Sequence, residues 1–402
     1  MIEKVKVRYH ILFLLIGLLY SNVFDGYTLY TTDSTTHLID NDLNIINEWN
    51  TNCQAASMGY LLPDSTLVYP CKQDDVVLEG VAASGGRIIK FDWSGNVLWD
   101  WSCDWDYQLH HDIEPTPDGT ILAIAIEDIN GFRPDVILEI RPEGMNDATL
   151  EWIWKVSDHT GSSDDPYKFD GEADYNQLDW NHFNTVSLNI DNQILLSSRN
   201  WCEIYIIDWG GDSDILYRWG NPQNYGVDGE QILFAQHGVN QIPTGYPGEG
   251  NIILFNNMNI QGGDNDNSIV IELTPDFETF EGDVVWTFDN NFYSPKQSGA
   301  FRLPNGNTFV TVAVDGYMFE VTSDGEVVWE LNRGGVVRAQ KYSIDYFNIL
   351  GDLNGDGNVN VVDIVLVVNY ILDNVFTDNA DMNNDGQLNV IDIVILVGDI
   401  LV

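Results

Sequence analysis

Five side chains that could carry charge-based chemistry stand at matching places in the sequence. His111 and His237 each lie seven residues before a turn that opens an apolar run, and His182 lies nine residues before one. His110 precedes His111, and Arg199 ends the apolar run that follows His182. The chain has only 17 Lys and Arg against 62 Asp and Glu, with 7 His. Basic residues at matched positions in so acidic a chain are therefore candidates for a functional site.

A cluster of imidazoles beside a guanidinium supports two kinds of chemistry. In the first, a neutral histidine attacks a sulfuryl or phosphoryl group while Arg199 and a protonated histidine neutralise its other oxygens. In the second, the histidines bind a metal ion that acidifies a water or a substrate proton. The first makes natural use of the arginine, whereas a cation is unfavourable beside a metal. His10, His37 and His159 lie outside the pattern and are assigned no function.

The elements that must position these residues form a unit that recurs along the chain. Each unit has a strand ending at a tryptophan, preceded by a short strand with an acidic turn, and most have a third strand such as "TPDGTILAIA". Such repetition predicts an all-β fold, a six-bladed β-propeller, with a β-sandwich of repeated hairpins as the alternative. The six tryptophans are Trp49, Trp99, Trp154, Trp219, Trp286 and Trp329.

The third strand of each unit is expected to be the innermost one. Residues just before it would then lie at one end of the central channel, and the histidines would converge near the axis. Residues 336–346 are expected to supply the last copy of this strand and to complete the blade begun at the N-terminus. A straight strand would separate His182 from Arg199 by more than about 12 Å, so the segment between them must turn back for both to reach one group.

The N-terminus and the charge indicate export. Lys4, Lys6 and Arg8 precede an apolar run at 11–20, which is too short to span a membrane and is typical of a signal peptide, assigned to residues 1–24. A net charge of −45 disfavours binding to nucleic acid or to anionic membranes. We expect a secreted, extracellular or cell-surface protein, or a periplasmic one, with no stable membrane insertion after cleavage.

Four cysteines in an exported chain permit disulfides without dictating them. Cys53 and Cys71 are the nearest pair in sequence, and Cys103 and Cys202 are the others. None has a Cys-x-x-Cys partner or an adjacent histidine, so bridges or buried thiols are favoured over a catalytic thiol.

Two segments near the C-terminus have the pattern of twelve-residue calcium loops, "DLNGDGNVNVVD" and "DMNNDGQLNVID". Oxygen ligands stand at positions 1, 3, 5, 9 and 12, a backbone carbonyl serves at position 7, and position 6 is glycine. Each loop leads into an apolar helix, and without calcium the segment is expected to be largely unfolded. The first loop's ligands are Asp352, Asn354, Asp356, Asn358, Asn360 and Asp363, and the second's are Asp381, Asn383, Asp385, Gln387, Asn389 and Asp392.

The segments "HHDIEPTPDGTIL", "DWNHFNTVSLNIDNQILLSSR" and "FAQHG" resemble those of the bacterial arylsulfotransferase family, over roughly residues 30–346. The resemblance implies a propeller, over residues 25–347, that moves a sulfuryl group from an aryl sulfate donor to a phenolic acceptor. It places the transiently sulfurylated histidine at His237. His182 and Arg199 would stabilise the transferred group, and His111, with His110 beside it, would protonate the leaving phenolate or deprotonate the acceptor. No metal or nucleotide is implied.

The calcium loops resemble a type I dockerin over residues 351–402, because position 12 is Asp and no helix precedes either loop. This resemblance implies two calcium ions and a cohesin partner on a scaffold or cell surface. Two other functions for the propeller stay open. One is a metal-dependent lyase or hydrolase acting on an acidic polysaccharide, and the other is a non-catalytic binding propeller.

Overall fold

The computed structural model describes residues 23–73, 78, 85–103, 105–161, 167–170, 179–210, 214–258, 267–347, 350–354, 359–383 and 385–400. The predicted signal peptide lies outside these residues except for its last two positions, and so does His10. Two predicted calcium ligands, Asp356 and Asn358, also lie outside them.

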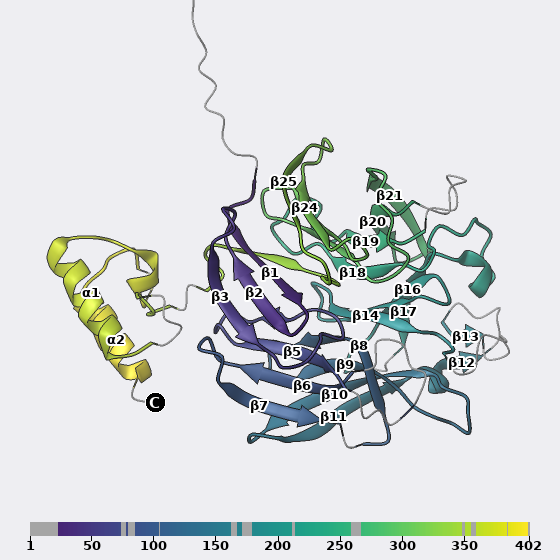
Figure 1. Ribbon diagram of the computed structural model, residues 1–402, viewed down its shortest axis with the longest axis horizontal. Coiled ribbons are helices and arrows are strands. Elements are labelled where there is room, and N and C mark those ends of the chain that lie inside the picture. The colour runs from purple at the N-terminus through teal and green to yellow at the C-terminus, as the bar shows by residue number, and fades with distance from the viewer. Residues whose placement is uncertain are drawn as a thin grey trace, which may run out of the picture.

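Within the described residues, six four-stranded antiparallel sheets are arranged as blades around a common axis (Figure 1). This confirms the predicted six-bladed β-propeller. From the axis outward, the first three blades are β26 (Gln340–Ser343), β1 (Gly26–Thr32), β2 (Thr35–Ile39) and β3 (Ile45–Asn50); β4 (Tyr60–Leu61), β5 (Leu67–Lys72), β6 (Gly86–Phe91) and β7 (Val97–Ser102); β8 (Gln108–Pro115), β9 (Ile121–Ile126), β10 (Asp135–Glu143) and β11 (Asp147–Lys155).

The other three blades follow the same order. They are β14 (Phe183–Leu188), β15 (Ile194–Ser198), β16 (Glu203–Ile207) and β17 (Ile215–Trp219); β18 (His237–Gln241), β19 (Ile252–Asn256), β20 (Ile269–Asp276) and β21 (Glu281–Phe288); β22 (Gly299–Arg302), β23 (Thr308–Val312), β24 (Tyr317–Val321) and β25 (Val327–Asn332). A short parallel pair, β12 (Thr160–Gly161) and β13 (Phe169–Asp170), and the 3-10 turns η1 (Val156–His159) and η2 (Pro222–Tyr225) lie in the connections.

The prediction of the innermost strand was wrong by one strand. The apolar strands that it selected, such as β9 and β15, lie second from the axis, and the strands before them, such as β8 and β14, are innermost and contact one another between blades. The inner strands carry polar residues that face the channel, so they lack the long apolar run by which a buried strand is recognised. The histidines therefore lie on the inner strands or directly before them.

The ring closes through its two ends, as the sequence predicted. Strand β26 pairs antiparallel with β1, with Gly26 opposite Ser343 and Leu29 opposite Gln340. Residues 336–346 thus complete the N-terminal blade, although they supply its innermost strand rather than a copy of β9. Pairing of the last strand with the first ties the ends of the ring together without a covalent link.

The repeated tryptophans join neighbouring blades from their outermost strands. The indole N–H of Trp49 donates at 2.8 Å to the carbonyl of Asp92, in the turn before the next blade's outer strand, and that of Trp99 donates at 2.8 Å to the carbonyl of Asp147, the first residue of such a strand. Trp286 and Trp329 donate to the corresponding turns of their neighbours. Each ring fills the apolar space between two blades while its N–H finds a partner.

The cysteines have structural positions. Cys53 and Cys71 form a disulfide with a Cα–Cα distance of 5.8 Å, as their proximity in sequence suggested. Cys103 and Cys202 are half-buried thiols. The Sγ of Cys202 donates to the carbonyl of Arg199 at 3.5 Å.

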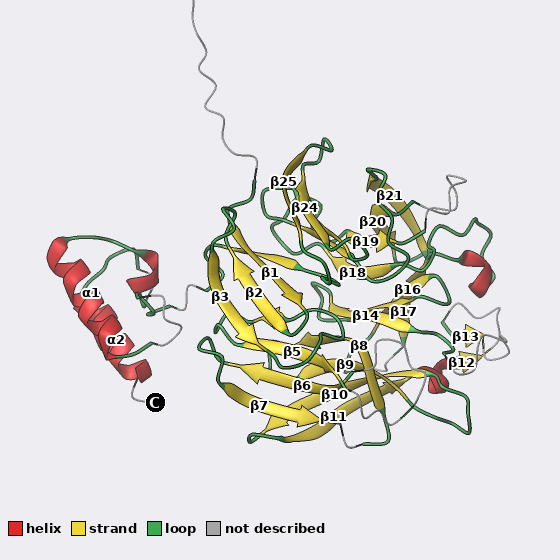
Figure 2. Ribbon diagram, viewed as in Figure 1, coloured by secondary structure: helices red, strands yellow, loops and turns green. Residues whose placement is uncertain are grey.

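After the propeller, the chain forms two α-helices, the main helical elements in Figure 2. Helix α1 (Val361–Asp373) and helix α2 (Val390–Ile400) pack through Val367 and Leu396, with the 3-10 turn η4 (Asp378–Ala380) between them. Among the described residues, no helix has the length and apolar character needed to cross a membrane.

Candidate active site

Three equivalent irregularities in the inner strands place the histidines. The pairing of β8 with β9 shifts register between Leu109 and Ile113, β14 shifts after Phe183, and β18 shifts after His237. His111 and His182 both have a φ of +51°, in the left-handed region, which a β-bulge allows. These bulges turn each imidazole out of the regular pleat, so the same distortion in successive blades brings the rings together.

The rings of His110, His111 and His182 are packed against one another. The ring centroids of His111 and His182 are 4.7 Å apart, and those of His110 and His111 are 5.0 Å apart. His111 and His237 line one small cavity of about 20 Å³. The structure thus brings together the histidines that the sequence singled out, and all of them are buried.

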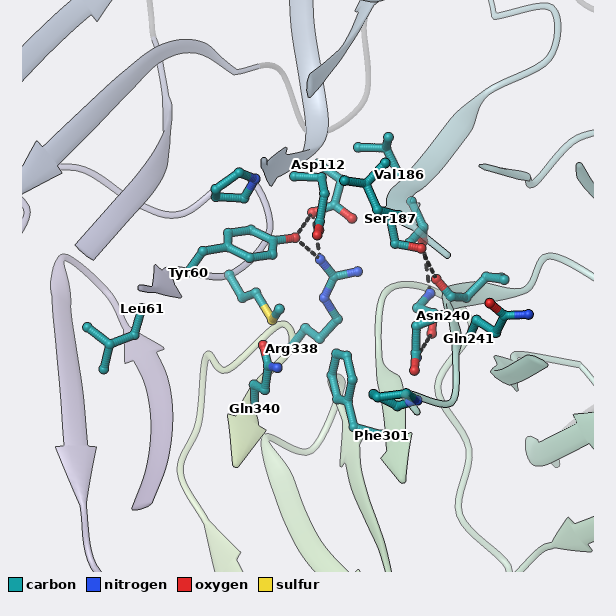
Figure 3. A pocket seen from close by; sticks show the side chains of 18 of the residues that line it. Tyr60, Leu61, Asp112, Val186, Ser187, Asn240, Gln241, Phe301, Arg338 and Gln340 are labelled. Carbon is teal, nitrogen blue, oxygen red and sulfur yellow. Dashed lines mark hydrogen bonds and ion pairs between the residues drawn. The ribbon is translucent and has the colours of Figure 1, made fainter. Parts of the chain in front are cut away.

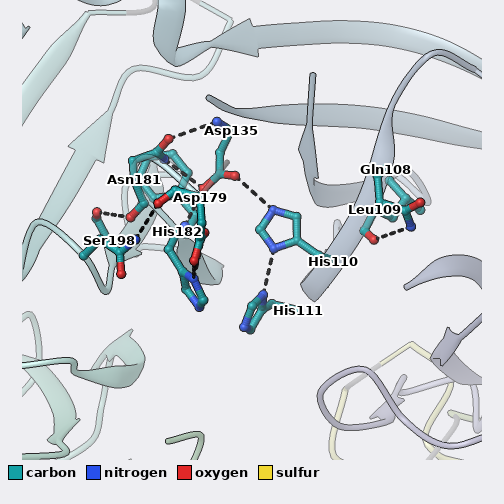
Figure 4. A network of polar contacts seen from close by, with 11 residues as sticks. Gln108, Leu109, His110, His111, Asp135, Asp179, Asn181, His182 and Ser198 are labelled. Atoms are coloured by element: carbon teal, nitrogen blue, oxygen red, sulfur yellow. Dashed lines mark hydrogen bonds and ion pairs between the residues drawn. The ribbon is translucent and has the colours of Figure 1, made fainter. Parts of the chain in front are cut away.

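A chain of hydrogen bonds fixes the tautomers of His110 and His111 (Figure 4). The Nε2 of His110 lies 3.1 Å from the carboxylate of Asp135, and the two Nδ1 atoms of His110 and His111 are 2.7 Å apart. Because the carboxylate only accepts, His110 donates from Nε2 and accepts at Nδ1 from His111. This leaves Nε2 of a neutral His111 with a free lone pair.

His182 and Arg199 are neighbours across a β-hairpin. Strands β14 and β15 pair antiparallel, and the backbone N–H of Arg199 donates to the carbonyl of His182 at 3.0 Å. The segment between the two residues therefore turns back, as it must if both side chains are to reach one group. The Nδ1 of His182 donates to the carboxylate of Asp179 at 2.7 Å, and Asp179 and Arg199 line one open cavity of about 550 Å³.

His237 is held by two acceptors at the same ring nitrogen. Its Nδ1 lies 2.8 Å from Oδ1 of Asn257 and 2.9 Å from the carbonyl of Ala235. The amide of Asn257 donates to the carbonyls of Ser294 and Gln297, which orients its oxygen toward the ring. His237 therefore carries its proton on Nδ1, and the lone pair of Nε2 is left for chemistry.

Burial keeps two of these imidazoles neutral. Burial, helped by the charges of His182 and Arg199 and opposed by the hydrogen bond to Asn257, lowers the pKa of His237 to about 3. Burial and then the neighbouring His182 and His110 hold the pKa of His111 well below its usual range. At neutral pH both rings are therefore bases or nucleophiles rather than acids.

Gln236, the residue before His237, connects two neighbouring blades through its side chain. The side-chain N–H groups of Gln236 donate to Ser197 Oγ at 3.1 Å and to the carbonyls of Ser198 and Glu203, both at 2.9 Å. The residue therefore ties the start of β18 to the neighbouring blade. The position of His237 depends on this link as well as on its own hydrogen bonds.

Sequence reasoning missed the residues that hold the histidines. Asp179 lies three residues before His182, so spacing could have revealed it. Asp112 directly follows His111, whereas Asp135, Asn257 and Arg338 come from distant strands or loops and gave no local signal. The missed residues are Asp112, Asp135, Asp179, Asn257 and Arg338, of which Asp112 and Arg338 line the central channel beyond the histidines.

The described residues of the calcium loops do not form complete sets of metal ligands. Among the described residues, no group of three His, Cys, Asp or Glu side chains is placed to hold a metal ion. In the second loop, the carboxylate of Asp381 accepts from the N–H groups of Asp385 and Gly386. The Oδ1 of Asp392 is buried without a hydrogen-bond partner, and Asp363 is fully buried. A buried carboxylate with an unused oxygen at position 12, as in Asp392, fits a bound cation.

The fold and the site define a propeller with a buried histidine cluster beside an arginine at one end of its channel. The family model "Arylsulfotransferase (ASST)" matches residues 74–346, so the chain belongs to the arylsulfotransferase family. A second model, for the type I dockerin domain, matches residues 350–401. Type I dockerins generally bind calcium and attach to cohesins, and both families are typically extracellular or surface-associated.

Solved structures match the chain at low sequence identity. A protein of unknown function from Bacteroides caccae is 13% identical with a TM-score of 0.51, and the match covers 79% of this chain and 98% of that one. Virginiamycin B lyase from Staphylococcus aureus is 14% identical with a TM-score of 0.39, over 80% and 85% of the two chains. No curated protein matches the chain.

Proposed function

We propose that the propeller transfers a sulfuryl group from an aryl sulfate to a phenol through a covalent intermediate on His237. The observation that carries this proposal is the locked state of His237. Two acceptors hold its proton at Nδ1, and burial keeps the ring neutral. A neutral imidazole of fixed orientation is a good nucleophile, because it needs neither deprotonation nor rotation before it attacks.

In the first step, the Nε2 lone pair of His237 attacks the sulfur of the donor. The N–S bond forms as the S–O bond to the aryl group breaks, and the phenolate leaves with that electron pair. Negative charge on the sulfuryl oxygens is stabilised by Arg199 and by His182, which Asp179 orients. No residue needs to change its protonation state for the nucleophile to act.

In the second step, a phenol attacks the sulfur and the N–S bond breaks. His111 accepts the phenolic proton at Nε2, and the Asp135–His110 pair orients it for that role. The sequence left open whether His111 acts as an acid or as a base. Its lowered pKa favours the base.

The transfer is tested with a chromogenic aryl sulfate and a phenol, in the presence of a chelator. We expect phenol release that increases with the acceptor, and a 35S-labelled or mass-shifted protein when the acceptor is omitted. His237→Ala should lose both signals by at least about 10³-fold. A labelled His237→Ala protein would contradict His237 as the nucleophile. Turnover that needs a transition metal would contradict the proposal and favour the metal-dependent lyase or hydrolase.

We further propose that the dockerin holds two calcium ions and displays the exported enzyme on a cohesin-bearing scaffold or surface. Burying the carboxylates of Asp363 and Asp392 disfavours folding unless a cation compensates their negative charge. Calcium titration of the intact protein should show two sites. Asp392→Asn should remove one site, while the aryl sulfate assay stays unchanged. A full titration by one ion, or none, would contradict this.

A further inference from the structure

A cavity in the central channel adjoins the histidine cluster and has no role in the mechanism so far. Its volume is about 270 Å³, enough for a small aromatic molecule, and Figure 3 shows its lining side chains. Aromatic and apolar groups form much of the wall, among them Met58, Tyr60, Phe301, Tyr342 and Tyr346. Such walls suit the ring of a phenol or an aryl ester better than they suit a sugar or a peptide.

Arg338 projects into this cavity between Tyr60 and Asp112 on one side and Ser187 and Asn240 on the other (Figure 3). Its Nη2 donates to Asp112 at 2.5 Å and to the hydroxyl of Tyr60 at 2.6 Å, and the side chain is 7% exposed. The Nε of Arg338 and the Oδ2 of Asp112 are buried without partners. The guanidinium is thus anchored through one nitrogen and keeps other donors uncommitted.

Arg338 also lines the small cavity of about 20 Å³ that contains His237 and His111. It is therefore the residue at which the ring-sized cavity and the nucleophile's cavity meet. The smaller space accommodates a group about the size of one water molecule. A donor whose ring occupies the larger cavity would place the oxygen that joins ring and sulfur beside Arg338.

Among the described residues, only one carboxylate, Asp112, competes with a phenolate for Arg338 at neutral pH. Asp112 neutralises Arg338, and burial, followed by the charge of Asp112, raises the pKa of Glu114 in the same cavity to about 8. Glu114 is therefore mostly uncharged at neutral pH. A phenolate formed there therefore shares the guanidinium with Asp112 and not with a second carboxylate.

We propose that Arg338 is a catalytic residue that donates a hydrogen bond to the phenolic oxygen of the substrate, with the aromatic ring held in the channel cavity. This rests on the proposed sulfuryl transfer. As the S–O bond breaks, its electron pair passes to that oxygen, and Arg338 stabilises the resulting charge without giving up a proton. Arg199 acts on the sulfuryl oxygens, and Arg338 acts on the leaving group.

The distinguishing test varies the acidity of the leaving phenol. We expect Arg338→Lys to reduce kcat/KM about tenfold for 4-nitrophenyl sulfate and at least about 100-fold for phenyl sulfate, whose less stable phenolate needs more help. Arg302→Lys is the matched control, because Arg302 is buried against Glu272 in the neighbouring blades. It should affect the two donors equally. Equal losses in Arg338→Lys would overturn the proposal.

A second variant displaces Arg338 without replacing it, so that a folding defect in Arg338→Lys cannot be mistaken for a loss of catalysis. A Cβ at Gly299 would lie 2.9 Å from Cδ of Arg338, so Gly299→Ala should displace the guanidinium without removing a charge. It should reproduce the leaving-group dependence in a weaker form. Equal loss for both donors in a folded Gly299→Ala protein would count against the proposal.

A binding measurement separates this proposal from the proposed function. In the His237→Ala protein, bound 4-nitrophenol should ionise about one pH unit below the free phenol, as its absorbance reports, and Arg338→Lys should abolish the shift. If the native protein transfers no sulfate, the proposed function fails, yet this titration still tests Arg338. An unshifted phenol, or a shift that survives Arg338→Lys, would refute the assignment.

Discussion

At the scale of residues, the site is built from ring nitrogens whose protons are assigned by their neighbours. Asp179 and Asn257 each bind one nitrogen of an imidazole, and Asp135 orients His111 through His110. The histidines are reactive because these partners fix the tautomers, and because burial removes the competing protonated form of His237 and His111. A histidine without such a partner would have neither a fixed tautomer nor a fixed ring orientation.

The neutrality of His237 should appear in the pH dependence of stability. Its pKa is about 3 in the folded protein and about 6.5 in the unfolded chain, so between about pH 3 and pH 6.5 the unfolded chain binds this proton and the folded protein does not. The free energy of unfolding should fall as pH falls from about 6.5 toward 3, by up to about 1.4 kcal/mol per pH unit. Urea unfolding of His237→Gln between pH 7 and 4 should show a shallower decline. An unchanged decline would mean that the fold does not exclude the proton.

At the scale of elements, the bulge at the start of β18 aims the nucleophile. Gly238 follows His237 with a φ of +63°, and a Cβ there would lie 2.6 Å from Cα of Gly299 in the next blade. Inner strands of neighbouring blades thus approach so closely that only glycine fits. The register of β18 against β19 and the packing against β22 together fix the direction of the ring.

Gly238→Ala should therefore misplace His237. We expect a loss of about 100-fold in kcat and a destabilisation of about 1–3 kcal/mol, measured by the transfer assay and by denaturant unfolding. Gly245→Ala is the control, since its φ is +85° but nothing lies within 4 Å of the added Cβ. It should cost stability through backbone strain and leave kcat unchanged. Matching activities in the two variants would contradict this view of the bulge.

At the scale of the whole molecule, the ring is held closed where its ends meet. Lys341 of β26 pairs with Glu320 of blade six at 2.7 Å, and both side chains are fully buried. Glu320 also accepts from the backbone N–H of Phe24 and from Asn307. One carboxylate thus links the last strand, β26, the segment that leads into the first strand, β1, and the neighbouring blade that carries Glu320.

Lys341→Met should destabilise the propeller by about 3–5 kcal/mol, because it leaves Glu320 buried without its cation. Adding Glu320→Gln should restore much of the loss. Thermal unfolding followed by tryptophan fluorescence reports the propeller, and calcium binding by the dockerin should not change. If the double variant is no more stable than Lys341→Met, the buried charge is not the cause.

The sequence determined the repeat and the kinds of residue in the site. Periodic apolar strands and the six tryptophans predicted the six blades, and matched spacing selected His111, His182 and His237. The calcium loops were recognisable because their ligands lie within twelve consecutive residues. Such features are local, so a linear pattern records them.

Only the tertiary structure decided which strand is innermost and which groups meet in the channel. The inner strands of the site mix polar and apolar residues, so no continuous apolar run marks them. Asp135 reaches His110 from another strand of the same blade, and Arg338 reaches Asp112 across 226 positions of sequence. Contacts of that kind form only when the closing ring brings distant strands to one axis, and for this reason the tautomers and the second arginine could not be predicted from the sequence.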